Sequence, residues 1–239
     1  MRCVVLSSSS AGNSTFIEYD GVKFLVDAGL GFNDMKNKLF EIGVSPDEID
    51  FIIVTHAHSD HIKSIHSFNR VYNTKIYIGK ETFEEDSKKS NITNYEFIDE
   101  VDNILGIDIK KIPISHDKKG FGYTFYKDGI SIAYMADTGM INFRYHEMLK
   151  NKTIYIFESN HDVEMEMNGT KDEMTKLRNI GDEGHLSNND CAMYLSRFIG
   201  EKTKYVMLIH ISDKDNTIDL AYNTNRNIID KRVKLLVSY

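Results

Sequence analysis

The sequence predicts an α/β fold in which strands and helices alternate along the chain. Short apolar runs such as Phe51–Val54 contain no polar residue, which is typical of strands buried on both faces. Between such runs, Asn33–Ile42 and Ser187–Phe198 space their apolar residues as one face of a helix does. No linker separates the two comparable halves, so we expect a single domain over residues 1–239, with helices packed outside sheets.

The first half of the chain predicts strands joined by turns. Ser14–Tyr19 alternates apolar and polar residues, and the pair Asp20-Gly21 favours a hairpin turn into Val22–Val26. The Ser/Gly/Asn-rich segment Ser7–Asn13 predicts a loop. The other predicted elements of this half are strands at Met1–Leu6, Phe51–Val54, Lys75–Ile78 and Asn103–Ile114, and helices at Asn33–Ile42, after His61 and at Glu81–Ser90.

The second half predicts another set of strands with helices between them. Asp128-Gly129 is a second hairpin signal, between Gly122–Tyr126 and Ile130–Met135. Ser187 has the chemistry of a helix N-cap, and Asp190 falls in the first turn of the helix that it would begin. The remaining predicted elements are helices near Asn142–Leu149 and Ile218–Ile229, and strands at Thr153–Phe157, Tyr205–Ile209 and Val233–Val237.

Composition excludes several classes of protein. Of the 239 residues, 41% are hydrophobic and 27% are charged, which is typical of a globular chain and argues against disorder. No apolar run is long enough for a membrane span or a signal-peptide core, so we expect a cytoplasmic protein. Cys3 and Cys191 are too few for a disulfide framework. The net charge of −7 argues against a general polyanion binder, so contact with nucleic acid would need a local basic patch or bound metal.

Metal-ligand chemistry is concentrated in the segment from His56 to His61. The spacing His56-x-His58-x-Asp60-His61 places imidazole nitrogens and a carboxylate within six residues, and both are good ligands for divalent ions. The segment follows the buried strand Phe51–Val54, where open α/β sheets place their ligands. A single buried histidine is usually just a hydrogen-bonded core residue, but three histidines and an aspartate at this spacing favour a metal site.

Four further apolar runs also lead into a residue of ligand type. Because the carboxyl ends of neighbouring strands meet at one edge of a sheet, we expect these residues to contribute to one polar site. The alternative is that each one is a separate structural residue. The four residues are Asp27, His116, Asp137 and His210.

This pattern resembles the metallo-β-lactamase fold, and most closely its YycJ/WalJ-type branch, which is regarded as a group of DNA exonucleases. The resemblance spans nearly the whole chain, and it departs after His210, at Asp213-Lys214-Asp215. Besides the histidine motif and the strand-end residues, it rests on the segments Ser8–Ser14, Leu25–Gly29, Ala136–Gly139, Glu158–Asp162, Gly184–Asn188, His210–Ser212 and Asn216-Thr217.

The resemblance implies an αββα sandwich of two mixed sheets that holds two divalent ions, zinc or manganese, with iron as a further alternative. One ion would be bound by His56, His58 and His116, and the other by Asp60, His61 and His210. Asp137 would bridge the two ions, and Asp27 would orient a ligand rather than bind metal.

The implied reaction is phosphodiester hydrolysis, as in a 5′–3′ DNA exonuclease, with attack by a hydroxide shared between the two ions. Asp60 is expected to take part in catalysis, and His185 and His161 are candidates for donating a proton to the leaving oxygen or for gripping a phosphate. The alternative for both histidines is that they hold loops by hydrogen bonds. For contact with DNA we expect Asn188, Lys118 and Lys119, and binding through the lysines should weaken with salt.

Two other classes of function stay open. The fold also serves other hydrolases, including small-molecule phosphodiesterases, thioesterases and lactonases, because function depends on the site and not the scaffold. A β-lactamase is less favoured because no export signal is visible. A non-catalytic binding module that keeps metals for structure is the third alternative, and the complete set of ligands argues against it.

Overall fold

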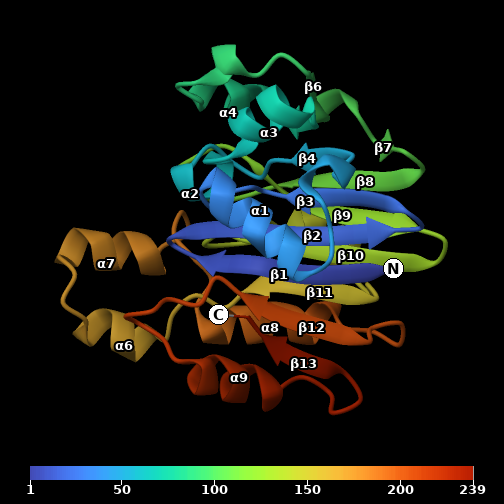
Figure 1. Ribbon diagram of the computed structural model, residues 1–239. Coiled ribbons are helices and arrows are strands. Elements are labelled where there is room, and N and C mark those ends of the chain that lie inside the picture. The colour runs from blue at the N-terminus through green and yellow to red at the C-terminus, as the bar shows by residue number, and fades with distance from the viewer. Residues whose placement is uncertain (239) are drawn as a thin grey trace. The chain divides into compact units, whose positions relative to one another are not determined.

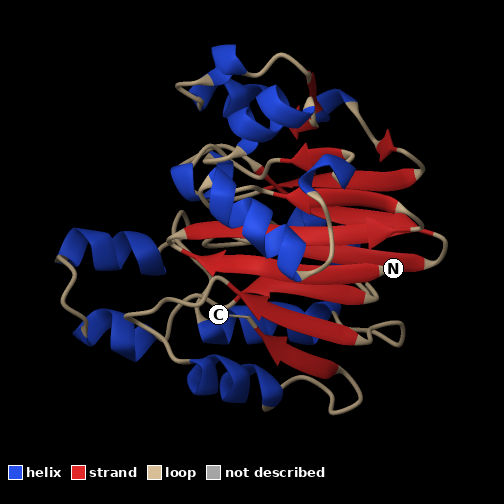
Figure 2. Ribbon diagram, in the orientation of Figure 1, coloured by secondary structure: helices blue, strands red, loops and turns tan. Residues whose placement is uncertain are grey.

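The computed structural model describes residues 1–238 and shows a mixed α/β chain with two mixed sheets, as Figure 2 displays by colour. The chain forms two compact units, residues 1–106 with 118–121 and residues 107–117 with the part from 122 onward. The single domain expected from the sequence stays a prediction. No helix among residues 1–238 combines the length and the apolar character that crossing a bilayer requires.

The first unit contains a sheet in the order β1-β2-β3-β4-β5-β6, antiparallel from β1 to β3 and parallel from β3 to β6 (Figure 1). The predicted hairpin at Asp20-Gly21 is confirmed, because both residues have the positive φ (46° and 83°) that such turns require. The strands are β1 (Arg2–Ser9), β2 (Gly12–Tyr19), β3 (Val22–Val26), β4 (Phe51–Ile53), β5 (Lys75–Ile78) and β6 (Tyr95–Phe97).

Helices of the first unit pack on one face of this sheet. Met35 and Leu39 of α1 and Ile65 and Phe68 of α3 are fully buried in one cluster with the apolar side chains of β2 to β5. Burial of this face stabilises the unit by roughly 25 cal/mol for each Å² of apolar surface removed from water. The helices are α1 (Phe32–Glu41), α2 (Ser59–Ile62), α3 (Ile65–Tyr72) and α4 (Lys80–Glu85), with 3-10 turns η1 (Pro46–Glu48), η2 (Lys89–Asn91) and η3 (Ile98–Glu100).

Three predicted elements differ from the structure. The predicted loop Ser7–Asn13 is mostly strand, because Ser8 pairs with Asn13 in the β1–β2 ladder despite its polar side chain. The predicted strand Asn103–Ile114 is broken by Leu105 and Gly106, both at positive φ, into β7 (Asn103–Ile104) and β8 (Ile107–Pro113). The predicted helix Glu81–Ser90 stops at Glu85 and resumes only as the short turn η2.

In the second unit, strands lie side by side in the order β13-β12-β11-β10-β9-β8. β9 and β10 are antiparallel and are joined by the predicted turn at Asp128-Gly129 (φ 50° and 82°), whereas β10 to β13 are parallel. The carboxyl ends of β10, β11 and β12 therefore share one edge of the sheet. The strands not yet defined are β9 (Phe121–Lys127), β10 (Ile130–Met135), β11 (Ile154–Glu158), β12 (Tyr205–Ile209) and β13 (Lys234–Val237).

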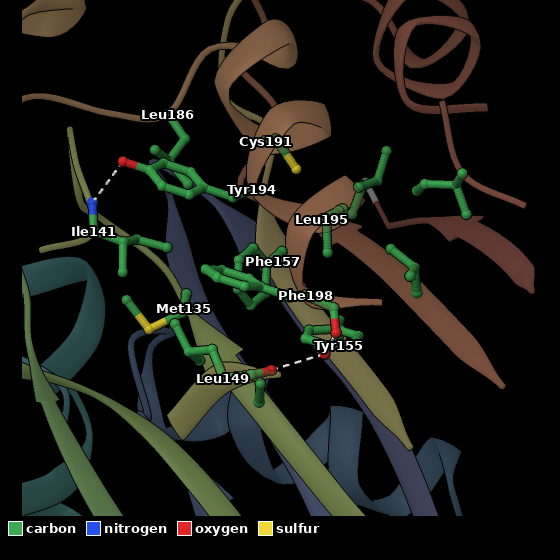
Figure 3. Packing of buried hydrophobic residues seen from close by; sticks show 14 of the residues in the cluster. Met135, Ile141, Leu149, Tyr155, Phe157, Leu186, Cys191, Tyr194, Leu195 and Phe198 are labelled. Carbon is green, nitrogen blue, oxygen red and sulfur yellow. Dashed lines mark hydrogen bonds between the residues drawn. The ribbon is translucent and has the colours of Figure 1, made fainter. Parts of the chain in front are cut away.

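The core of the second unit lies between this sheet and helix α8 (Figure 3). Tyr194 and Phe198 of α8 cluster with Tyr155 and Phe157 of β11, and the Tyr194 hydroxyl accepts a hydrogen bond from the Ile141 amide at 3.1 Å. The helices are α5 (His146–Leu149), α6 (Val163–Asn168), α7 (Glu173–Ile180), α8 (Asn188–Phe198) and α9 (Ile218–Arg226), with the 3-10 turn η4 (Phe143–Tyr145).

The predicted cap of α8 is confirmed. Ser187 precedes the helix with extended backbone, and its hydroxyl accepts a hydrogen bond from the Asp190 amide at 3.1 Å. Such a cap satisfies one of the backbone donors at a helix start and is worth about 1 kcal/mol. The cap also fixes the position of the segment before α8, which contains His185.

Candidate metal centre

Several strand-end residues with ligand chemistry share an unusual backbone conformation. Asp27 follows β3, Asp137 lies just beyond β10 and His210 follows β12, with φ of 62°, 51° and 55° respectively. Residues with a Cβ adopt this left-handed region at a cost of roughly 1–2 kcal/mol, and such strain concentrates at functional sites. The sharp bend turns each side chain out of the strand direction at the edge of its sheet.

In the first unit, Asp27 anchors the histidine motif. Its carboxylate accepts hydrogen bonds from the Thr55 amide and hydroxyl, both at 2.7 Å, and from Nδ1 of His61 at 2.8 Å. All three residues are almost completely buried. Burial raises the pKa of the Asp27 carboxyl, while the charge and hydrogen bond of His61 oppose this rise.

The other nitrogen of His61 faces a second polar group. Its Nε2 lies 3.6 Å from Oδ2 of Asp60 and 3.0 Å from the side-chain nitrogen Nδ2 of Asn13. The same Nδ2 of Asn13 donates a hydrogen bond to Oδ2 of Asp60 at 3.1 Å. An imidazole nitrogen and a carboxylate oxygen therefore converge, and Asn13 holds the carboxylate in place.

His56 and His58 also bring two nitrogens together. Nε2 of His56 lies 2.9 Å from Nδ1 of His58, while the Nδ1 of His56 contacts the Thr55 hydroxyl at 3.1 Å. Two imidazole nitrogens at this distance need a proton or a cation between or beside their lone pairs. The arrangement fits a pair of metal ligands.

Glycine at position 29 allows the motif to pack against β3. A Cβ on Gly29 would overlap the carbonyl oxygen of Asp60, and the Gly29 amide donates to the carbonyl of Asn13 at 2.9 Å. The backbone amide of the neighbouring Ala28 donates a hydrogen bond to the His61 carbonyl at 2.8 Å. The backbone of Asp60 and His61 is thus fixed against the end of β3.

In the second unit, the side chains of Asp137, Glu158, His185 and His210 offer ligand atoms that all lie within 4.8 Å of one another. Glu158 ends β11, and its Oε1 accepts from Nδ1 of His185 at 2.7 Å and from Nδ1 of His210 at 2.8 Å. Asp137 Oδ1 lies 3.3 Å from the same nitrogen of His210. This group alone has the composition of a divalent-metal site.

Glu158 is the electrostatic centre of this group. Its second oxygen accepts from the amides of Thr138 and Leu186, at 3.1 and 3.3 Å, and the side chain has no exposed surface. Burial alone would raise the pKa of Glu158, but His185 and His210 outweigh it and lower the pKa to about 2. We therefore assign Glu158 as a carboxylate that holds both rings through their Nδ1 atoms.

Three of the five predicted ligand histidines share one feature that fits metal binding. Nδ1 of His61 and of His210 contacts a carboxylate oxygen, and Nδ1 of His116 lies 3.1 Å from the Gly184 carbonyl. An Nδ1–H that donates to oxygen leaves the Nε2 lone pair as the ligand atom, and metal-binding histidines usually have such a partner. The donor set therefore fits divalent ions.

His185 and His161 differ in accessibility. The side chain of His185 is 16% exposed, whereas His161 is fully buried. Within residues 1–238 neither ring nitrogen of His161 has a hydrogen-bond partner, and burial lowers its pKa. The His161 backbone pairs with Ser187, and its carbonyl accepts from the Asn188 amide at 2.8 Å, so His161 also lies beneath the start of α8.

The predicted DNA-contact residues have different environments. Asn188 is 2% exposed, and its side chain is bonded to Ser159 at 2.7 Å and to Asn216 at 2.9 Å, so the side chain ties together the loops beneath α8. Lys118 lies 3.3 Å from Glu85. Lys119 is exposed, and its ammonium has no ion pair in the described part of the chain.

Sequence reasoning missed the roles of Glu158 and Asn13. Glu158 ends the apolar run Ile154–Phe157, so the strand-end pattern that identified Asp137 could have identified it too. Asn13 carried no such signal, because it lies within a segment that was expected to be a loop. Its contacts with Asp60 and His61 come from residues 47 and 48 positions away.

Comparison with known proteins gives consistent results. The profile of the metallo-beta-lactamase superfamily matches residues 9–135. The chain is 35% identical to exodeoxyribonuclease WalJ of Streptococcus pneumoniae over 93% of this chain and 86% of that protein. It is 31% identical to exodeoxyribonuclease YycJ of Bacillus anthracis over 95% of this chain and 89% of that protein.

A solved structure shows the same fold. The metallo-beta-lactamase fold protein YhfI of Bacillus subtilis superposes with a TM-score of 0.75, covering 99% of this chain and 95% of that one. Sequence identity is 16%, so this likeness concerns the fold alone. The two mixed sheets and the predicted fold class are confirmed.

Proposed function

Because the chain belongs to the metallo-β-lactamase superfamily, we propose that it is a metal-dependent hydrolase that acts as a DNA exonuclease. The observation that carries this proposal is the 35% and 31% identity to two exodeoxyribonucleases over nearly the whole chain. The cluster around Glu158 and the paired nitrogens of His56 and His58 support it, because they provide ligands for divalent ions.

We propose the ligand set that the resemblance implies. His56, His58 and His116 would hold one ion, Asp60, His61 and His210 a second, and Asp137 would lie between the two. The engaged Nδ1 atoms of His61, His116 and His210 support the assignment of Nε2 as the ligand atom. Asp27 would act through His61, whose ring it orients. Zinc or manganese suits this mixture of imidazole and carboxylate, with iron as a further alternative.

Bound ions would supply an activated water molecule and neutralise the charge of a phosphodiester. The protein itself would donate a proton to the leaving oxygen. Nδ1 of His185 is held by Glu158, so Nε2 can carry the proton that the leaving oxygen takes up when the phosphorus–oxygen bond breaks. The partial exposure of His185 supports this role over the buried His161.

DNA would be bound by a narrow basic strip, since the net charge of the chain is −7. The exposed position of Lys119 supports this proposal. Lys118 forms an ion pair with Glu85, which it would have to share with a phosphate. Contacts between lysines and phosphates release counterions, so binding should weaken as salt rises. The 5′–3′ direction and the cytoplasmic location expected from the sequence stay predictions.

His185→Ala tests the proposed reaction. We expect nuclease turnover on end-labelled linear duplex DNA to fall by about 10²–10⁴, the range for loss of a general acid, while bound metal is retained. The matched control is His66→Ala, which removes a histidine that contacts Asp86 instead of the metal-ligand cluster. Unchanged turnover in His185→Ala would refute the proton-donor role, and loss of metal would show that His185 is a ligand.

Substrate choice separates the nuclease from other hydrolases of the fold. The purified protein should degrade linear duplex DNA in the presence of Mn²⁺ and should turn over p-nitrophenyl phosphodiesters more slowly. Hydrolysis of thioesters or lactones without cleavage of DNA would favour the alternative function. Metal analysis of the freshly purified protein identifies the ion to use in these assays.

A further inference from the structure

A polar cavity lies in the second unit, at the edge of the sheet where β10, β11 and β12 begin. Its volume is about 400 Å³, which falls in the range of small-ligand sites. The parallel strands β10, β11 and β12 run from this edge to the opposite one (Figure 1). Asp137, Glu158 and His210 lie at or just beyond the far ends of these strands. Five residues of strand at about 3.3 Å each place the two edges roughly 17 Å apart.

Four lysines and one aspartate line this cavity, so its charge is positive in a chain whose net charge is negative. Lys150 is paired with Glu147 at 2.6 Å. No ion pair neutralises the ammonium groups of Lys110, Lys152 and Lys202 in the described residues. Burial lowers the pKa of Lys152, and the nearby positive charges of Lys110 and Lys202 lower it further. The aspartate is Asp108.

Backbone hydrogen bonds hold two of these lysines in place. The Lys202 amide donates to Oδ1 of Asn151 at 2.9 Å, and the Lys152 carbonyl accepts from the Thr203 hydroxyl at 2.8 Å. The Lys152 amide in turn donates to the buried Tyr155 hydroxyl at 3.0 Å. These hydrogen bonds fix the backbone of Lys152 and Lys202 beside the cavity. An anion bound between the lysine side chains would reduce the repulsion between their charges.

An aromatic ring lines the same cavity. Tyr126 is 49% exposed, although it lies in β9 beside the fully buried Phe125. An exposed aromatic face beside cations is the combination that binds a nucleotide, because the base stacks on the ring and the phosphate contacts the lysines. Thr124 and Ser131 also line the cavity.

We propose that this cavity is a binding site for a nucleoside phosphate, with the phosphate held by Lys110, Lys152 and Lys202 and the base stacked on Tyr126. The nucleoside phosphate is either a free mononucleotide or one nucleotide of a DNA strand. The proposal does not rest on the nuclease activity, since the cavity shares no residue with the metal-ligand cluster.

Isothermal titration of the metal-loaded protein with dAMP, with a short single-stranded oligonucleotide whose phosphorothioate linkages resist hydrolysis, and with inorganic phosphate tests the proposal. We expect Lys152→Gln and Lys202→Gln each to weaken binding of dAMP or of the oligonucleotide by roughly tenfold, as for loss of one charge-assisted hydrogen bond. Tyr126→Ala should weaken binding of the nucleotide but not of phosphate. The matched control is Lys231→Gln, which removes an exposed lysine outside the cavity.

The pattern of results identifies the source of the ligand. Binding of dAMP that depends on the lysines and on Tyr126 supports a free nucleotide, and the same dependence for the oligonucleotide alone supports a DNA strand. Affinities that are unchanged in both lysine variants overturn the site, as does the absence of saturable binding. Equal affinity for phosphate and dAMP, with no effect of Tyr126→Ala, overturns the nucleoside assignment. Thermal unfolding of each variant verifies that it is folded.

Discussion

Replacing Glu158 by glutamine tests whether one buried carboxylate organises the second-unit cluster. The folded protein lowers the pKa of Glu158 from its ordinary 4.5 to about 2. That difference corresponds to about 3 kcal/mol of stability, at 1.36 kcal/mol for each tenfold change in the equilibrium. Glutamine cannot accept charge-assisted hydrogen bonds from both His185 and His210, so we expect Glu158→Gln to lose on the order of this free energy of unfolding near pH 5, below the ordinary pKa of imidazole.

The pH dependence has a defined sign. A carboxyl whose folded pKa is lowered stabilises the protein above its unfolded pKa, and this contribution is lost as the pH falls through the folded value. The difference in unfolding free energy between wild type and Glu158→Gln should therefore shrink as the pH falls from about 4.5 to 2. Urea unfolding of the metal-free proteins at several pH values measures this difference.

The same variant should lose function. His185 and His210 would no longer be held by a common carboxylate, so turnover and metal content should both fall. Glu147→Gln is the matched control, because that side chain is exposed and the change should cost less than about 0.5 kcal/mol. A Glu158→Gln protein that loses under about 1 kcal/mol and keeps full turnover would refute the central role given to this carboxylate.

Three further variants test other parts of the structure. Asp137→Ala should reduce bound metal and abolish turnover, as measured by elemental analysis and nuclease assay; full activity would exclude a role in holding the ions. Gly29→Ala should destabilise the protein by at least about 2 kcal/mol in urea, because its Cβ would overlap the Asp60 carbonyl; a wild-type midpoint would mean that the loop moves freely. Tyr155→Phe should cost about 1–3 kcal/mol, because the Lys152 amide loses its acceptor and the hydroxyl no longer donates to the Leu149 or Phe198 carbonyl; an unchanged thermal midpoint would contradict this.

Much of the fold could be predicted because its signals are local. Asp20-Gly21 and Asp128-Gly129 adopt the positive φ that their hairpins need, and Ser187 caps α8 by bonding to a residue three positions away. The predictions failed at Ser7–Asn13 and Asn103–Ile114. In both, pairing or a tight turn in the backbone decided the outcome, and side-chain composition carries little information about either.

The amino-acid sequence by itself predicted a metal site in this protein, because His56, His58, Asp60 and His61 are neighbours along the chain and their side chains are of metal-ligand type. Only the tertiary structure decided which other residues form hydrogen bonds to the candidate metal-ligand side chains. Asn13 and Glu158 act on partners 27 to 52 positions away, and such pairs form only when the folded backbone brings distant segments together. The tertiary structure likewise lowers the pKa of Glu158, because it places the imidazoles of His185 and His210 beside this buried carboxylate.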